Sequence, residues 1–108
     1  MYDKFVILDS AKEELKDIKK YVKKEFGELT WNKVNAEYKA AFKLIKANPK
    51  SGSSIEELKE LGVTNVKYRL VRQTRVVYEF DEQLILVHMF ISTKRDFLTH
   101  LMKRLFNQ

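Results

Sequence analysis

Cysteine is absent from this chain of 108 residues, which excludes disulfides, thiolate nucleophiles and zinc sites built on thiolates. The two histidines lie at no spacing that would make a metal site. The chain also lacks a glycine-rich phosphate loop and the strand-to-helix turn that carries a serine nucleophile. We therefore expect neither a metal ion nor another cofactor.

Long apolar segments are missing as well. No apolar run approaches the length of about 18 residues that a membrane span needs. No cationic and then apolar leader follows Met1. We therefore expect a cytoplasmic protein that has no membrane partner.

The composition is that of one small globular domain, residues 1–108. Hydrophobic residues make up 44% of the chain and charged residues 33%, which is too apolar for intrinsic disorder. Lys and Arg number 21 against 15 Asp and Glu, so the formal net charge is +6. This surplus favours an anionic partner such as nucleic acid, a nucleic-acid enzyme or an acidic protein chain, although a solvated surface without a partner would show the same surplus.

Two helices follow a short buried strand at residues 4–8. The apolar stripe of the first helix consists of Ala11, Leu15, Ile18 and Val22. Gly27 ends this helix with a left-handed cap. The second helix begins near Thr30 and ends before Asn48-Pro49, because proline cannot continue it. Its stripe consists of Trp31, Val34, Tyr38, Ala41 and Ile45. With three or four residues between them, the two helices should pack as an antiparallel hairpin.

The second half of the chain changes to an alternating pattern. A short helical turn at residues 55–61 precedes two alternating strands, 66–71 and 75–80, which are joined by a turn. A third strand, 84–91, is apolar at nearly every position and should be covered on both faces. A last helix begins at Thr93.

The order of these elements predicts an α+β fold, β-α-α-β-β-β-α. We expect an antiparallel sheet packed against a long helical hairpin, with the first strand at the sheet edge and a C-terminal helix nearby. His88 lies inside the apolar third strand, where a core histidine with one satisfied hydrogen bond is favoured over a catalytic one.

Several short motifs, taken in order, carry a resemblance to a known family. These motifs are Tyr21 to Gly27, Asn48-Pro49 with Gly52, Arg69, Arg75 to Glu79, Lys94 to Leu98, Leu101, and Arg104-Leu105. Over almost its whole length the chain resembles the RelE/ParE toxins of type II toxin–antitoxin systems, and most closely the ParE branch. Many family members have a histidine before the final basic pair. Ile91-Ser92-Thr93 stands there instead, so no role of that histidine is carried over.

The resemblance implies a toxin that a cognate antitoxin holds inactive. ParE relatives stall DNA gyrase on DNA, whereas RelE relatives cut messenger RNA in the ribosomal A site. The long hairpin and the terminal helix favour the gyrase-directed branch, with the ribosome-dependent endoribonuclease as the alternative and an inactive member as a third possibility. The expected partner is a ParD-like antitoxin whose acidic, partly disordered segment folds across the toxin surface, giving a toxin–antitoxin hetero-oligomer. That pairing predicts a basic toxin with an apolar groove.

Four cations, Lys67, Arg69, Arg72 and Arg75, fall within an acid-free stretch of the sequence. Such a cluster suits phosphate oxygens or an acidic peptide, because guanidinium groups offer paired donors. Lys67 and Arg69 have the same strand parity and should emerge from one face. The alternative is a solvated face with scattered ion pairs, for example to Glu79.

A nuclease interpretation requires a proton acceptor, a proton donor and cations around one phosphate. The residue types that the RelE branch uses are matched here by Lys67, Arg69, Arg75, Tyr78 and Lys94. Tyr78, however, shares its face with Val76 and Phe80, which favours a position in the core. Lys94-Arg95 would open the terminal helix, where cations oppose the helix dipole and Asp96 offsets part of the effect. The candidates for target binding are Arg69, Arg72, Arg75, Lys94 and Arg95.

Overall fold

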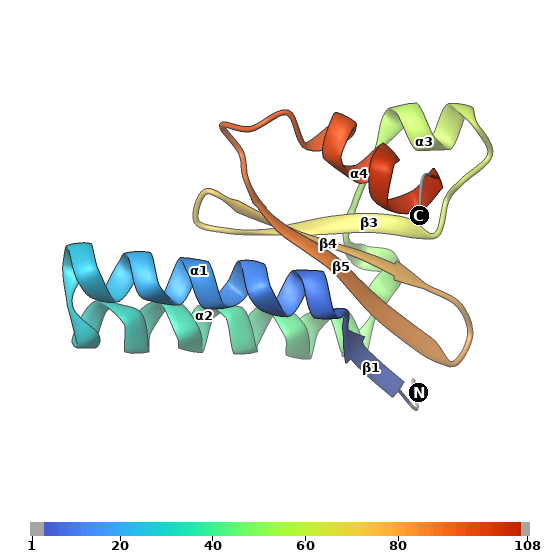
Figure 1. The fold of residues 1–108 in the computed structure, drawn as a ribbon. Coiled ribbons are helices and arrows are strands. Elements are labelled where there is room, and N and C mark those ends of the chain that lie inside the picture. The colour runs from blue at the N-terminus through green and yellow to red at the C-terminus, as the bar shows by residue number, and fades with distance from the viewer. Residues whose placement is uncertain (1–3, 107–108) are drawn as a thin grey trace.

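The computed structural model describes residues 4–106 and contains one sheet and two layers of helices (Figure 1). The elements in chain order are β1 (Lys4–Ile7), α1 (Asp9–Phe26), α2 (Glu28–Ala47), η1 (Pro49–Ser51), β2 (Ser53–Ser54), α3 (Glu56–Glu60), β3 (Val66–Val71), β4 (Thr74–Phe80), β5 (Leu84–Ser92) and α4 (Phe97–Phe106). This arrangement confirms the predicted α+β class with its helical hairpin and C-terminal helix. Within the described residues, no helix combines the length and the apolar character needed to cross a bilayer.

The five strands form one mixed sheet in the order β1-β5-β4-β3-β2. Three neighbouring pairs are antiparallel, whereas β1 lies parallel to β5, with Lys4 opposite Leu84. The first strand therefore joins the sheet edge, as predicted. β5 lies between β1 and β4 and is buried along most of its length, as expected of a strand that is covered on both faces.

The helical hairpin turns through a single residue, so the predicted loop of three or four residues is wrong. Gly27 has φ 92°, a left-handed conformation that favours glycine. Its N–H donates to the carbonyl of Lys23 (3.0 Å), and its carbonyl accepts from the N–H of Trp31 (3.1 Å). Because this one residue caps both helices, α2 begins at Glu28 and not near Thr30.

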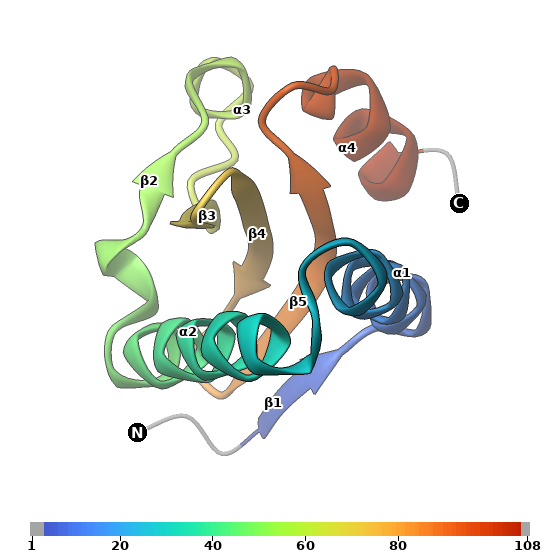
Figure 2. The same cartoon turned by 90° about the vertical axis from the view of Figure 1, so that its left-hand side faces the viewer.

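The sheet lies between the α1–α2 hairpin on one side and α3 and α4 on the other (Figure 2). It separates two apolar cores. One lies between the sheet and the α1–α2 hairpin, on what we call the hairpin face, and includes Tyr38, Ile45, Val76, Tyr78, Val87 and Phe90. The other lies beneath α3 and α4, on the α4 face, and includes Leu58, Val66, Val77, Met89, Ile91 and Leu101. Alternate residues of one strand therefore enter different cores, as the strand period requires.

A bulge in the pairing of β4 with β5 is stabilised by side chains from two helices. The register shifts between Val77 and Tyr78, which leaves His88 as the extra residue of β5. Glu14 of α1 accepts from the N–H of Phe90 (3.0 Å) and forms an ion pair with Arg104 of α4 (2.5 Å). Arg104 also donates to the carbonyl of His88. The network satisfies backbone groups at the bulge and joins α1, β5 and α4.

The last helix begins at Phe97, so the predicted start at Thr93 is wrong. Asp96 precedes the helix and accepts from the N–H (3.3 Å) and the hydroxyl (2.7 Å) of Thr99, which is N-cap geometry. The Thr99 hydrogen bonds lower the pKa of the Asp96 carboxyl. The N–H of Thr93 instead donates to the carbonyl of Gln73 in the β3–β4 turn (2.8 Å).

Candidate functional site

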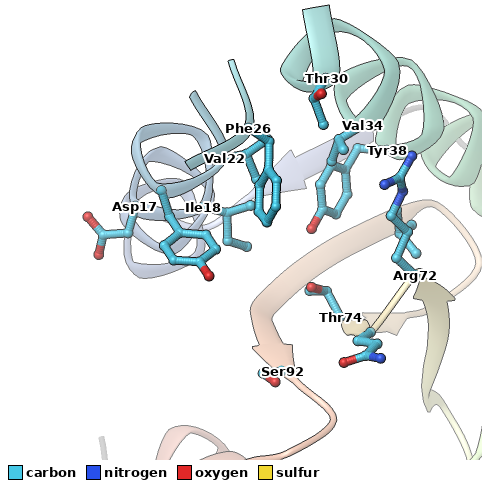
Figure 3. A pocket seen from close by; sticks show the side chains of 13 residues that line it. Asp17, Ile18, Val22, Phe26, Thr30, Val34, Tyr38, Arg72, Thr74 and Ser92 are labelled. Carbon is cyan, nitrogen blue, oxygen red and sulfur yellow. The ribbon is translucent and has the colours of Figure 1, made fainter. Parts of the chain in front are cut away.

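A groove of about 630 Å³ opens between the loop end of the hairpin and the β3–β4 turn (Figure 3). Its lining comes from both helices, from the turn and from the end of β5: Asp17, Ile18, Tyr21, Val22, Phe26, Thr30, Val34, Tyr38, Val71, Arg72, Gln73, Thr74 and Ser92. The hairpin extends past the sheet (Figure 1), so the inner apolar stripe near Gly27 has no strand beneath it.

The groove is apolar inside and carries exposed aromatic side chains. Ile18 and Val22 of α1 lie across from Val34 of α2 (Figure 3). Tyr21 and Phe26 are 59% and 61% exposed and make an edge contact with ring centroids 6.2 Å apart. An apolar slot of this size, open to solvent, fits one face of a partner helix.

At the sheet side of the groove, Arg72 is held by a carboxylate of α2. Its Nε and Nη2 donate to the two carboxylate oxygens of Glu37, each at 2.9 Å. This pairing lowers the pKa of the Glu37 carboxyl. Arg72 has φ 55° and forms a two-residue turn with Gln73. The Arg72–Glu37 ion pair therefore holds the β3–β4 turn against α2.

The remaining cations of residues 67–75 do not share one surface. Arg69 lies opposite Val76 on the hairpin face, together with Lys67, whose shared parity with Arg69 is as predicted. Arg75 lies opposite Leu70 and points to the α4 face. Its guanidinium lies 4.2 Å from the ring centroid of Phe97 and 5.5 Å from that of Tyr68. The sheet therefore separates Arg69 from Arg75.

Lys67 and Arg69 contact the loop that follows α2. Arg69 Nη2 donates to Ser51 Oγ (2.5 Å), and Lys67 Nζ donates to Ser54 Oγ (3.1 Å). Neither cation has a carboxylate partner among residues 4–106. Arg69 Nε is buried and has no hydrogen-bond partner within the same range. The charge of this pair of side chains is therefore not balanced locally.

Tyr78 lies in the core, as its strand parity predicts, and its side chain is fully buried. Its hydroxyl donates to the carbonyl of Pro49 (2.5 Å) and thereby fastens η1 to the sheet. Burial raises the pKa of the phenol, an effect that the positive charge of Arg69 partly opposes. A buried hydroxyl bound to a carbonyl is a structural group in this conformation.

Gly52 packs so closely on Tyr78 that a side chain there would collide with it. A Cβ on Gly52 would lie 2.1 Å from Tyr78 Oη and 3.1 Å from Lys67 Cβ. We expect Gly52→Ala to destabilise the protein by about 1–3 kcal/mol, since overpacking displaces buried atoms. Tyr78→Phe should cost about 1 kcal/mol alone and should relieve part of the Gly52→Ala penalty. A double-mutant cycle of urea unfolding measures this coupling, and additive losses would contradict it.

The other candidate residues lie apart from these groups. Lys94 and Arg95 are exposed in the turn between β5 and α4, and the Thr93–Gln73 hydrogen bond places that turn beside the β3–β4 turn. His88 is 4% exposed, and its Nε2 lies 2.7 Å from Glu79 Oε1, which confirms the prediction of a core histidine with one hydrogen bond.

Reasoning from the sequence missed the groove residues Tyr21 and Phe26 and the serines Ser51 and Ser54. The available signal for the first pair was two aromatic side chains near the end of a lysine-rich amphipathic helix. The serines gave no signal, because their contacts join segments that are distant in sequence.

Comparison with known proteins assigns the family. The family model described as ParE toxin of type II toxin-antitoxin system, parDE, matches residues 5–97. No curated protein matches the chain significantly in sequence. The family match begins at the second residue of β1, covers every element from α1 through β5 and ends at the first residue of α4. The chain therefore belongs to the ParE family of toxins of type II toxin–antitoxin systems.

Proposed function

We propose that this toxin inhibits DNA gyrase by binding to it and that a cognate ParD-like antitoxin neutralises the toxin. The main support for inhibition by binding, and not by catalysis, is that the sheet separates Arg69 from Arg75. The family match over residues 5–97 supports a ParE-like target.

The geometry gives less support to the alternative, a ribosome-dependent endoribonuclease. Lys67, Arg69 and Tyr78 lie on the hairpin face, with the phenol buried against Pro49. Arg75 lies on the α4 face, and Lys94 lies in the turn after β5. Phosphodiester cleavage needs acid, base and cations to converge on one phosphate. These five residues do not converge, so a binding toxin fits the arrangement better.

Among the candidate target-binding residues, Arg69, Lys94 and Arg95 have neither a carboxylate nor an aromatic partner within residues 4–106. Arg72 is paired with Glu37, and Arg75 is stacked against Phe97. We propose that the first three make the primary contacts to gyrase or to the DNA held by it. Arg72 positions the β3–β4 turn, and Arg75 positions α4, around these three contact residues.

The antitoxin segment fits the groove. An amphipathic helix can insert apolar side chains between Val22 and Val34, and the net charge of +6 of the toxin would attract its acidic residues. Binding there would bury Tyr21 and Phe26, which are exposed without a partner. The result is a toxin–antitoxin hetero-oligomer.

The state of cells that express the toxin without its antitoxin tests the choice of target. We expect filamented cells with broken DNA, because stalled gyrase leaves cleaved chromosomes. Rapid translation arrest with messages cut inside codons would replace gyrase with the ribosome as the target. Normal growth, with the toxin present at the same level, would identify an inactive member of the family.

A further inference from the structure

We propose that the sheet side of the groove is a subsite for one side-chain carboxylate of the antitoxin helix, formed by Gln73, Thr74 and Ser92. The inference rests on the proposed function, because it takes the antitoxin as the occupant of the groove. It goes further by naming the side chain that this occupant must carry and the toxin residues that select it.

The groove has an apolar half and a polar half (Figure 3). Ile18, Val22 and Val34 come from the two helices, whereas Thr74 and Ser92 come from the sheet. A helix that inserted only apolar side chains would cover the two hydroxyls without giving them partners, which costs free energy. The occupant should therefore carry a polar group at this point.

The pairing of β4 with β5 brings the two hydroxyl side chains together. Thr74 and Ser92 are directly opposite at the end of the ladder, and both are half-buried. The next pair inward on the same face, Val76 and Phe90, is buried in the core on the hairpin face. The face therefore changes from apolar to hydroxyl-bearing where the core ends and the groove begins. Directly opposite Cβ atoms lie about 5 Å apart, so one small polar group can contact both hydroxyls.

Both hydroxyl positions have hydrogens left to donate. The Tyr38 hydroxyl lies at the bottom of the groove and is hydrogen-bonded to the Thr74 side chain. That bond uses one of the two hydroxyl hydrogens of the pair, so the other remains. Ser92 Oγ accepts from the N–H of Lys94 (3.2 Å) and keeps its own hydrogen. Two donors are therefore available to an acceptor that enters the groove.

Gln73 and the local charge favour a carboxylate over a neutral acceptor. The side-chain amide of Gln73 lines the groove without a hydrogen-bond partner within residues 4–106, and the backbone of Gln73 is fixed because its carbonyl accepts from Thr93 (2.8 Å). The exposed cations Lys94 and Arg95 follow in the chain. Among the described lining residues the one acid is Asp17, whose carboxylate points away from the sheet side in Figure 3. Hydrogen bonds to an ionised acceptor are also the stronger ones.

Removal of one hydroxyl at a time tests the subsite. The probe is the purified cognate antitoxin, and calorimetric titration gives its dissociation constant from each variant of the full chain. Thr74→Val keeps the branched shape and should weaken binding at least about tenfold, because a hydrogen bond to a charged group is lost. Ser92→Ala should weaken binding at least about fivefold for the same reason.

Thr30 provides the matched control, because it also lines the groove but lies on α2, in the apolar half (Figure 3). Thr30→Val makes the same chemical change and should leave the affinity within about twofold. A purely apolar contact predicts the opposite order, since a valine at position 74 would improve it. Unchanged or tighter binding by both Thr74→Val and Ser92→Ala would overturn the proposal.

Variants of the antitoxin identify the carboxylate. Each Asp or Glu of its toxin-binding segment is changed singly to Asn or Gln, which keeps the shape and removes the charge. One such change should weaken binding to the unmodified toxin at least about fivefold, yet weaken binding to Thr74→Val by less than about twofold, because residues in contact are coupled. Equal losses in both backgrounds for every acid would contradict a carboxylate at this subsite.

Phe26→Glu separates this inference from the proposed function, because Phe26 lies in the groove outside the subsite. If Phe26→Glu weakens antitoxin binding and Thr74→Val does not, the antitoxin occupies the groove but the carboxylate subsite is wrong. If neither variant changes the affinity, the groove is not the antitoxin site and both proposals fail. Thermal unfolding of each variant confirms that a loss of binding is not a loss of fold.

Discussion

Phe26→Glu should produce a folded toxin that its antitoxin no longer holds tightly. Phe26 lines the groove and is 61% exposed, so the substitution removes little from the core. In the complex that we propose, this ring is covered by an apolar helix face, and a glutamate would be buried there without a partner. Loss of a central aromatic contact at an interface costs at least about 2 kcal/mol, equivalent to roughly 30-fold weaker binding.

Leu29 provides the matched control for this experiment. It lies at the same end of the hairpin and is 79% exposed, yet it does not line the groove. Leu29→Glu adds the same charge near the same helix ends and should leave the antitoxin affinity within about threefold, as expected for a position outside the interface core. Calorimetric titration of each variant with the purified antitoxin gives the comparison. Equal losses in both variants would mean that charge, and not burial in the groove, explains the effect.

The helices and strands could be predicted because their buried side chains recur in the sequence at the helical or the strand spacing. The stripe from Trp31 to Ile45 repeats at helical spacing because every member is buried in the core on the hairpin face. Residues 66–71 alternate because the two faces of β3 enter different cores. Such patterns are local, so one sequence is sufficient to read them.

The arrangement of the cations could not be predicted, because it depends on the length of one turn. A three-residue turn at 72–74 would pair Val71 with Arg75 and place Arg75 on the face of Arg69. The structure has a two-residue turn, Arg72–Gln73, which pairs Val71 with Thr74 and reverses the face of Arg75. A change of one residue in register exchanges the two faces of a strand. The positive φ of Arg72 permits this turn although the sequence lacks the usual Asn-Gly signal.

The role of Glu14 was hidden for a different reason. Glu14 lies three residues after Ala11 and four before Ile18, at the edge of the apolar stripe of α1. A charged residue at such a position is expected to be exposed to solvent. Its partners are the N–H of Phe90 and the guanidinium of Arg104, both distant in sequence. The Glu14 carboxylate accepts a backbone N–H beside the bulge at His88. A bulge does not change the periodic pattern of the sequence, so this role could not be predicted.

Glu14→Ala should therefore be among the most destabilising substitutions of a charged residue in this protein. It removes the acceptor of the Phe90 N–H and the carboxylate that forms the ion pair between α1 and Arg104. Breaking a fully buried pair costs 3–5 kcal/mol; since these side chains are 26% and 28% exposed, we expect about 2–3 kcal/mol. The midpoint and slope of urea unfolding measure the change in the free energy of unfolding.

Glu13 is the neighbouring control, because it pairs with Lys16 at 3.6 Å with both side chains 70% exposed. Glu13→Ala should change the free energy of unfolding by less than about 0.5 kcal/mol, as exposed pairs contribute little. Comparable losses from the two variants would show that helix propensity or net charge, and not the network at the bulge, governs the response. If only Glu14→Ala is destabilising, this carboxylate is what ties the terminal helix, which lies largely beyond the family match, to the shared domain.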